Sequence, residues 1–139
     1  MTIEQLAQLE ERKREMTNKH KKILLIEDDE SNRLCLREFL KDRGYVCQEA
    51  ENGAEGLVKL QSEPFDLVIT DLNMPIMNGF QLVDALATSS SLNQIPVLIV
   101  TGQSLSEVRQ KTTHPLVKGV LPKPYDFPQI SRSLAALFS

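Results

Sequence analysis

The sequence predicts an α/β fold: a doubly wound, five-stranded parallel sheet with helices on both faces, plus an N-terminal helical extension. Five apolar runs alternate along the chain with five segments of helical periodicity. The inner runs, such as "ILLI" and "VLIV", are continuously apolar rather than alternating, which is typical of parallel strands covered on both faces. Right-handed crossovers between such strands place helices on both sides of the sheet.

Composition limits the function classes. The 139 residues are 41% hydrophobic and 25% charged, as in ordinary globular proteins. A net charge of −3 argues against a sequence-independent nucleic-acid binder. The chain contains neither an apolar run of about 18 residues nor the apolar core of a signal peptide. We therefore expect a cytoplasmic protein with no nucleic-acid or membrane partner, in which Cys35 and Cys47 are free thiols.

Two parts differ in composition: residues 1–20 form an extension and residues 21–139 form one domain. The extension is charged and lacks glycine and proline, and Thr2 and Gln5 have the spacing of a capping box. Its larger apolar residues share one helical face: Leu6, Leu9 and Met16. This stripe is too short to predict a coiled coil. A solvated helix, a partner-binding or dimer-forming helix, and the end of a signalling helix from a larger parent protein all remain open.

The first half of the domain has clear boundaries. Gly44 is placed to close a helix in the left-handed conformation. The helix before it has an apolar inner face that comprises Leu36, Phe39 and Leu40. The predicted elements, in order, are strand 22–26, helix 31–44, strand 45–50 and helix 52–63.

The second half follows the same alternation. Asn78 and Gly79 open one helix, and Asp126 caps the last one, whose inner face contains Ile130, Leu134, Leu137 and Phe138. Pro115 cannot sit inside a helix, so the preceding helix is expected to end by about Thr113, before an irregular segment 114–119. The predicted elements, in order, are strand 65–71, helix 78–88, strand 95–101, helix 104–111, strand 119–123 and the last helix.

Polar side chains end four of the strands. Because ligands bind beyond the carboxyl ends of parallel strands, these residues are the candidate site. We expect one shallow site that contains Glu27, Asp28, Asp71, Thr101 and Lys123. Two carboxylates about 5 Å apart repel by roughly 3 kcal/mol at an effective dielectric of about 20, so something positive must offset them.

These residue types indicate phosphoryl chemistry. Glu27, Asp28 and Asp71 offer the hard oxygen ligands that suit Mg²⁺. An aspartate can form an aspartyl phosphate, and a metal ion and a lysine such as Lys123 can stabilise the phosphoryl oxygens during transfer. The hydroxyl of Thr101 can donate a hydrogen bond to the same oxygens. The acids are therefore expected to be tolerated because Mg²⁺ sits between them.

Four motifs, "ILLIEDDESN", "VITDLNMPIMNGF", "VLIVTGQ" and "LPKPYD", resemble those of the CheY-like receiver domain of bacterial two-component response regulators. The resemblance covers residues 22–138 and implies a flavodoxin-like, CheY-like sheet. It implies that Asp71 receives a phosphoryl group from a histidine of a partner kinase or phosphotransfer protein, assisted by Thr101 and Lys123. Such a domain is a phosphoacceptor that assists its own phosphorylation and dephosphorylation rather than an enzyme, and it signals to a downstream protein.

The resemblance also implies finer details of the site. The backbone carbonyl of Asn73 would join Glu27, Asp28 and Asp71 around Mg²⁺, and the Lys123–Pro124 peptide bond would be cis. In the family, the positions of Asn73 and Gln103 flank the path of the water that removes the phosphoryl group.

Two departures from the family pattern concern the output face. Val120 occupies the position, three residues before the lysine, where the family usually has a tyrosine or phenylalanine that acts as a rotating switch. The usual turn of small residues after the preceding helix is replaced by Pro115, Leu116 and Val117. We therefore expect the signal to be read elsewhere, by the loop after Thr101 or by the first and last helices.

Three alternatives come from other classes. A flavin mononucleotide carrier of similar fold would have its phosphate repelled by the acids that follow the first strand. A haloacid-dehalogenase-type phosphatase uses a second acid two residues after its nucleophile, where this chain has Asn73. A pseudo-receiver, a protein-interaction module that works without phosphorylation, usually lacks the aspartate, the lysine or the acid pair, all of which are present here.

Overall fold

The computed structural model describes residues 1–18 and 21–139, the side chains of residues 14–18 excepted. Five parallel strands form one sheet in the order β2-β1-β3-β4-β5, which confirms the predicted fold class. The strands are β1 (Lys22–Ile26), β2 (Val46–Ala50), β3 (Leu67–Asp71), β4 (Val97–Thr101) and β5 (Val117–Pro122). The central strands β3 and β4 are buried throughout, as their continuous apolar runs predict.

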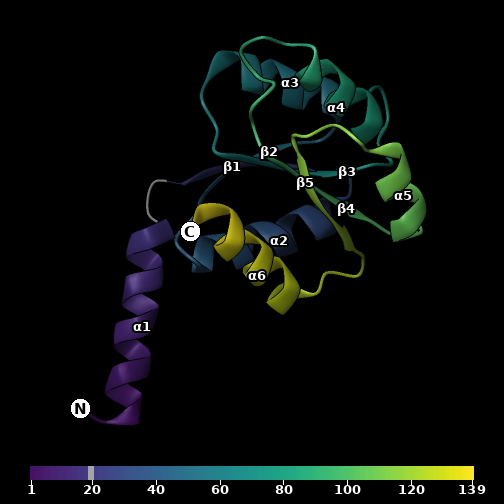
Figure 1. Ribbon diagram of the computed structural model, residues 1–139. Helices are drawn as coiled ribbons and strands as arrows, with labels where there is room; N and C mark the ends of the chain where they lie inside the picture. Colours follow the sequence, from purple (N-terminus) through teal and green to yellow (C-terminus); the bar gives the residue numbers. More distant parts are fainter. Residues whose placement is uncertain (19–20) are drawn as a thin grey trace.

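Helices cover both faces of the sheet (Figure 1). On one face lie α2 (Glu30–Asp42) and α6 (Phe127–Phe138), and on the other lie α3 (Gly53–Ser62), α4 (Gly79–Ala87) and α5 (Leu105–Lys111). Each face has its own core. The predicted inner residues of α2 and α6 lie in or against one of them: Leu36, Phe39, Leu40, Ile130, Leu134, Leu137 and Phe138. The doubly wound arrangement is therefore confirmed.

Side-chain caps fix where the helices begin. The carboxylate of Asp126 accepts a hydrogen bond from the Gln129 amide at 3.1 Å, and Asn78 forms a capping box with Gln81. Gly44 closes the turn after α2 with a φ of 89°, in the left-handed region that glycine tolerates. These local signals could be recognised in the sequence, and most predicted boundaries of helices and strands lie within two residues of the observed ones.

The predicted fifth strand is present as β5, but its start was predicted two residues too late. The sequence suggested an irregular segment 114–119 and a strand 119–123, whereas β5 begins at Val117 and ends at Pro122. Val117 pairs with Val97 and Gly119 pairs with Leu98, so Lys118 is the extra residue of a β-bulge. The bulge lets the strand start earlier than Gly119 suggested. The preceding helix, α5, does end before Pro115, as predicted.

The N-terminal extension contains α1 (Ile3–Asn18), which lies apart from the two helical layers (Figure 1). The predicted capping box is present, with reciprocal hydrogen bonds of 2.9 and 3.0 Å between Thr2 and Gln5. The predicted apolar stripe starts with exposed Leu6, whereas the side chain of Met16 and residues 19–20 lie outside the described part of the chain. Among the described residues, no helix is long and apolar enough to cross a membrane.

Candidate functional site

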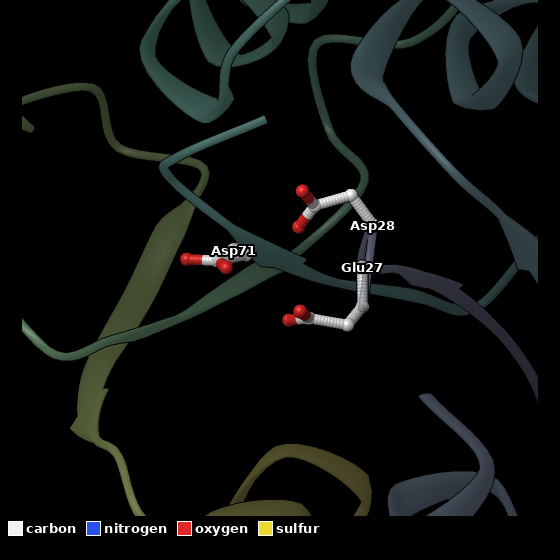
Figure 2. Close-up of side chains that lie close together, drawn as sticks. All are labelled: Glu27, Asp28 and Asp71. Atoms are coloured by element: carbon white, nitrogen blue, oxygen red, sulfur yellow. The ribbon is translucent and has the colours of Figure 1, made fainter. Parts of the chain in front are cut away.

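Three carboxylates meet at the carboxyl edge of the sheet. Glu27 and Asp28 follow β1, Asp71 ends β3, and each offers a ligand oxygen within 4.8 Å of the others (Figure 2). Glu27 is only 1% exposed and Asp71 only 6%, whereas Asp28 is open to solvent. The strand pairing of β1 with β3 brings these acids together although they are far apart in the sequence, as their positions at strand ends predicted.

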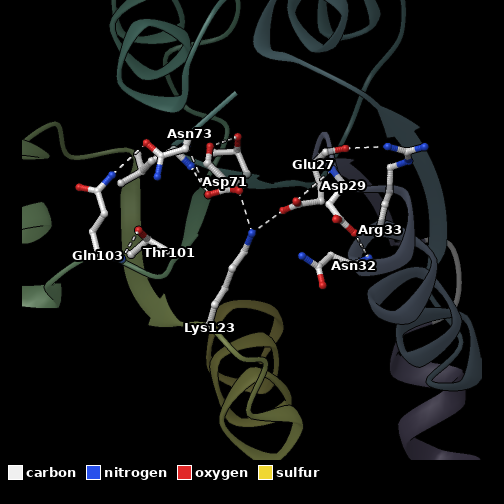
Figure 3. Close-up of polar contacts among 11 residues, drawn as sticks. Glu27, Asp29, Asn32, Arg33, Asp71, Asn73, Thr101, Gln103 and Lys123 are labelled. Carbon is white, nitrogen blue, oxygen red and sulfur yellow. Dashed lines mark hydrogen bonds and ion pairs between the residues drawn. The ribbon is translucent and has the colours of Figure 1, made fainter. Parts of the chain in front are cut away.

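Lys123 supplies the positive charge inside this cluster. Its Nζ donates to Asp71 Oδ2 at 2.7 Å and to Glu27 Oε2 at 2.8 Å (Figure 3). The backbone holds the lysine in place, because the Lys123 amide donates to the Thr101 carbonyl at 2.8 Å. The Lys123–Pro124 peptide bond is cis, as the resemblance implied. The repulsion between the two buried carboxylates is thus offset by an ammonium group that contacts both.

The protonation equilibria reflect this burial. Desolvation raises the pKa of Glu27, and the nearby Asp71 raises it further, while the hydrogen bond from Lys123 opposes the shift. Burial of the Lys123 ammonium lowers its pKa, but the hydrogen bonds to Asp71 and Glu27 outweigh this, so that its pKa is raised. The lysine therefore remains charged at neutral pH and keeps the cluster together.

The Asp71 carboxylate is oriented by the backbone as well. Its Oδ1 accepts hydrogen bonds from the Leu72 amide at 2.7 Å and from the Asn73 amide at 3.4 Å. Its Oδ2 faces Lys123. One aspartate is thus held by neutral donors on one side and by a cation on the other, which fixes its direction toward the edge of the sheet.

Thr101 and two amide side chains lie beside the aspartate. The buried Thr101 Oγ1 accepts from the Gln103 amide at 3.0 Å, and Gln103 Nε2 donates to Asn73 Oδ1 at 3.0 Å (Figure 3). This last bond joins the loops that follow β3 and β4. The two amides that the sequence placed beside the site are therefore in direct contact with each other.

Two neighbouring residues have roles that sequence reasoning missed. The carboxylate of Asp29, the third acid of the run, caps α2 by accepting from the Asn32 amide at 2.8 Å, and it is absent from the carboxylate cluster. Arg33, on the first turn of α2, donates to the Glu27 carbonyl at 2.7 Å. An arginine one helical turn after a capping aspartate was the available signal. Arg33 positions the backbone that carries Glu27.

The comparisons with known proteins identify the family of the chain. The model of the response regulator receiver domain family matches residues 23–135. The chain belongs to this family. The chemotaxis protein CheY-3 of Vibrio cholerae is 32% identical over 122 residues, which make up 87% of this chain and 94% of CheY-3. The family that the four motifs resembled is therefore confirmed.

Solved receiver structures share the fold. CheY4 of Vibrio cholerae, a chemotaxis response regulator, is 33% identical and matches with a TM-score of 0.77, covering 84% of this chain and 97% of CheY4. The response regulator TrrA of Thermotoga maritima, solved in complex with Mg²⁺ and BeF, is 27% identical with a TM-score of 0.75, covering 84% of this chain and 98% of TrrA.

The donor set of this receiver domain fits Mg²⁺. The three clustered oxygens come from carboxylates, the hard ligands that Mg²⁺ prefers, and exposed Asp28 leaves room for the waters that this ion retains. None of the three is a soft sulfur ligand or a histidine. The residues present thus suit a hard divalent cation better than zinc or copper.

The other end of β5 departs from the family pattern, as the sequence indicated. Val120 is 4% exposed and packs in the core that α3, α4 and α5 share. In the segment before β5, His114 Nε2 lies 2.8 Å from Asp84 Oδ1 on α4. A side-chain contact between α4 and this segment therefore stands where the family usually has a turn of small residues.

Proposed function

We propose that this receiver domain accepts a phosphoryl group on Asp71 from a phosphohistidine of a partner kinase or phosphotransfer protein. It acts as a phosphoacceptor in the cytoplasm, one that assists its own phosphorylation and dephosphorylation without being a turnover enzyme. The observation that carries this proposal is the buried Asp71 carboxylate, 2.7 Å from Lys123 Nζ and grouped with Glu27 and Asp28.

The transfer step follows from the donors around Asp71. A carboxylate oxygen of Asp71 attacks phosphorus, the phosphorus–nitrogen bond breaks, and its electron pair stays on the departing imidazole, which then takes a proton from solvent. Lys123 moves its hydrogen bond to a phosphoryl oxygen, and the Thr101 hydroxyl donates to another. The backbone amide of Leu72 continues to hold the remaining carboxylate oxygen, so the aspartate does not need to reorient.

Mg²⁺ is the proposed cofactor. Glu27, Asp28, Asp71 and the backbone carbonyl of Asn73 are the residues that would hold it. When bound, the ion neutralises charge on the phosphoryl oxygens. The clustered carboxylates support this assignment, as does the Mg²⁺ in the TrrA complex.

The deciding experiment is incubation with Mg²⁺ and acetyl phosphate, followed by intact-mass spectrometry. One labile phosphoryl group should be added to the wild type and none to Asp71→Asn. The absence of any addition to the wild type would favour the pseudo-receiver instead, an interaction module that works without phosphate. Mapping the adduct by borohydride reduction would then assign it to Asp71 or to another acid.

Output is proposed to pass through protein contacts to a downstream target. A pull-down that compares the metal-free protein with a Mg²⁺ and beryllofluoride complex would identify proteins retained in one state alone.

A further inference from the structure

The loop between β3 and α4 contains a strained residue. Ile76 has a φ of 70°, the single positive value among the described residues other than glycine. The Met77 amide donates to the Pro75 carbonyl at 2.7 Å, which closes a γ-turn around Ile76. A γ-turn of positive φ is rare and strained, and a β-branched side chain makes it more so. Glycine or asparagine would adopt this conformation more easily.

The surroundings impose this turn. The Met77 carbonyl accepts from the Gly53 amide at 3.0 Å, which ties the turn to the start of α3. The Gly79 amide donates to the Leu72 carbonyl at 3.0 Å and closes the base of the loop. Met77 also packs against the core on its α3–α4 side. The backbone at position 76 is thus fixed by its neighbours, whatever side chain it carries.

Burial does not compensate for the strain, because Ile76 is 82% exposed. An isoleucine in the fold's interior could offset an unfavourable φ through the apolar area that it removes from water. Here the side chain projects into solvent. Ile76 therefore contributes little to the stability of the isolated domain.

Ile76 lies in the loop that leads from Asp71 to α4. Ile76 belongs to the loop whose first amides hold Asp71 Oδ1. We define the loop rim as the exposed residues Asn73, Pro75, Ile76 and Gln103, the last of which is bonded to Asn73. The loop rim is uncharged and partly apolar, whereas the turn after β1 on the other side of the site exposes the acids Asp28, Asp29 and Glu30. Asp71 is nearly buried, so a macromolecule that reaches it must cover the surface around it.

We propose that Ile76 is a contact residue for the protein that carries the phosphohistidine, and that it packs into an apolar depression beside that histidine. This inference rests on the proposed function. It accounts for an exposed isoleucine kept in a strained turn, because the side chain becomes buried when the donor binds. Because the loop rim is uncharged, we expect the surface of the donor protein opposite Ile76 to carry few charges.

The test compares two phosphodonors. Acetyl phosphate is too small to bury the Ile76 side chain while it reacts, whereas a phosphorylated histidine-phosphotransfer domain, chosen because it transfers to the wild type, covers it. The variants are Ile76→Asn and Ile76→Gly, both compatible with positive φ. The matched control is Val58→Asn, which removes another exposed β-branched residue (61% exposed) from the regular helix α3.

For both Ile76 variants we expect a melting temperature that is higher by about 2–6 °C, since strain is relieved. Phosphorylation by acetyl phosphate should stay within about twofold of wild type, because the groups around Asp71 are unchanged. The kcat/KM for transfer from the phosphotransfer domain should fall at least about tenfold, because an isoleucine side chain is no longer buried on binding. Val58→Asn should leave both phosphorylation rates unchanged.

An unchanged rate of transfer from the protein donor would overturn the inference, and so would a melting temperature that falls in both Ile76 variants. Equal loss with both donors would also overturn it, because the effect would then lie at Asp71. If the wild type takes no phosphoryl group from acetyl phosphate, the proposed function fails first, which separates the two failures.

Discussion

The two ends of β5 differ in how closely they follow the receiver family. After its carboxyl end, Lys123 bonds two carboxylates from two other strands, and the peptide bond that follows is cis. Toward its start, the buried Val120 stands where the family usually has an aromatic residue, and the strand has a bulge at Lys118. The two regions adjoin opposite ends of one strand of six residues.

The difference indicates which parts of a receiver domain are constrained by the chemistry of its site. Under the proposed function, the lysine, carboxylates and hydroxyl at the carboxyl end must meet around one phosphorus atom, so a small displacement abolishes the geometry. The start of β5 faces α4 and α5, where the requirement is to pack a core and to present a surface to a partner. The residues of a binding surface can change when the partner protein changes, whereas the residues of the site cannot.

The largest expected effect separates these regions directly. Asp71→Asn should abolish phosphoryl incorporation and leave the fold intact. Because it removes one charge from a cluster of three carboxylates and one lysine, its stability without metal should stay level or rise. Intact mass and thermal melting measure both quantities. Continued incorporation at the same position would refute the assignment of Asp71.

Val120→Ala is the comparison variant for this experiment. It truncates a buried side chain and should therefore lower stability by about 1–2 kcal/mol. Its phosphoryl incorporation should nevertheless match the wild type under conditions where both are folded.

The second effect concerns the metal. If Mg²⁺ binds the folded form as proposed, then at ten times its dissociation constant it should raise the melting temperature by about 3–5 °C, corresponding to about 1.4 kcal/mol. Asp28→Ala should lose this response. Asp84→Ala, which removes an exposed acid at the α4 contact, should keep it. A wild type that does not respond to millimolar Mg²⁺ contradicts the metal assignment.

Much of the site was predictable because the ends of the strands can be recognised in the sequence. Continuous apolar runs mark buried parallel strands, and the polar residue that ends each run must lie at the shared edge, so Asp71 and Lys123 could be paired across the sheet. Three adjacent acids look alike in sequence, however, and only the helix start shows that Asp29 is a cap. The contact of Arg33 with Glu27 was missed because the acceptor is a backbone carbonyl.

Two backbone features were not predictable for a related reason. The bulge at Lys118 depends on how β5 pairs with β4, which local propensity does not encode. The γ-turn at Ile76 violates the rule that glycine or asparagine marks positive φ. In both cases, tertiary contacts impose a conformation that the residue itself does not favour.

The third effect lies at the rim of the site. The bonded amides of Asn73 and Gln103 join two loops beside Asp71, so a charge at either position should disturb the path of the attacking water. We expect Asn73→Lys and Gln103→Glu each to change the dephosphorylation rate at least about threefold. Gln94→Lys, an exposed amide before β4 at the opposite end of the sheet, is the matched control. Rates in both variants equal to those of wild type and control would refute this role.

The smallest expected effect concerns the start of β5, where Val120 differs from the family pattern. Val120 is too short, and too stiff at its first torsion, to swing between buried and exposed positions as the family's aromatic residue does. Val120→Ala should therefore leave phosphate-dependent partner binding unchanged, as should Val97→Ala, a core control of equal chemistry. Gly102→Leu should weaken that binding instead, because Gly102 lies in the loop after Thr101, and a Cβ added there meets no atom within 4 Å, so the fold tolerates it. Binding is measured as retention of proteins by the beryllofluoride complex. If Val120→Ala loses this retention and Gly102→Leu keeps it, the signal passes through β5 after all.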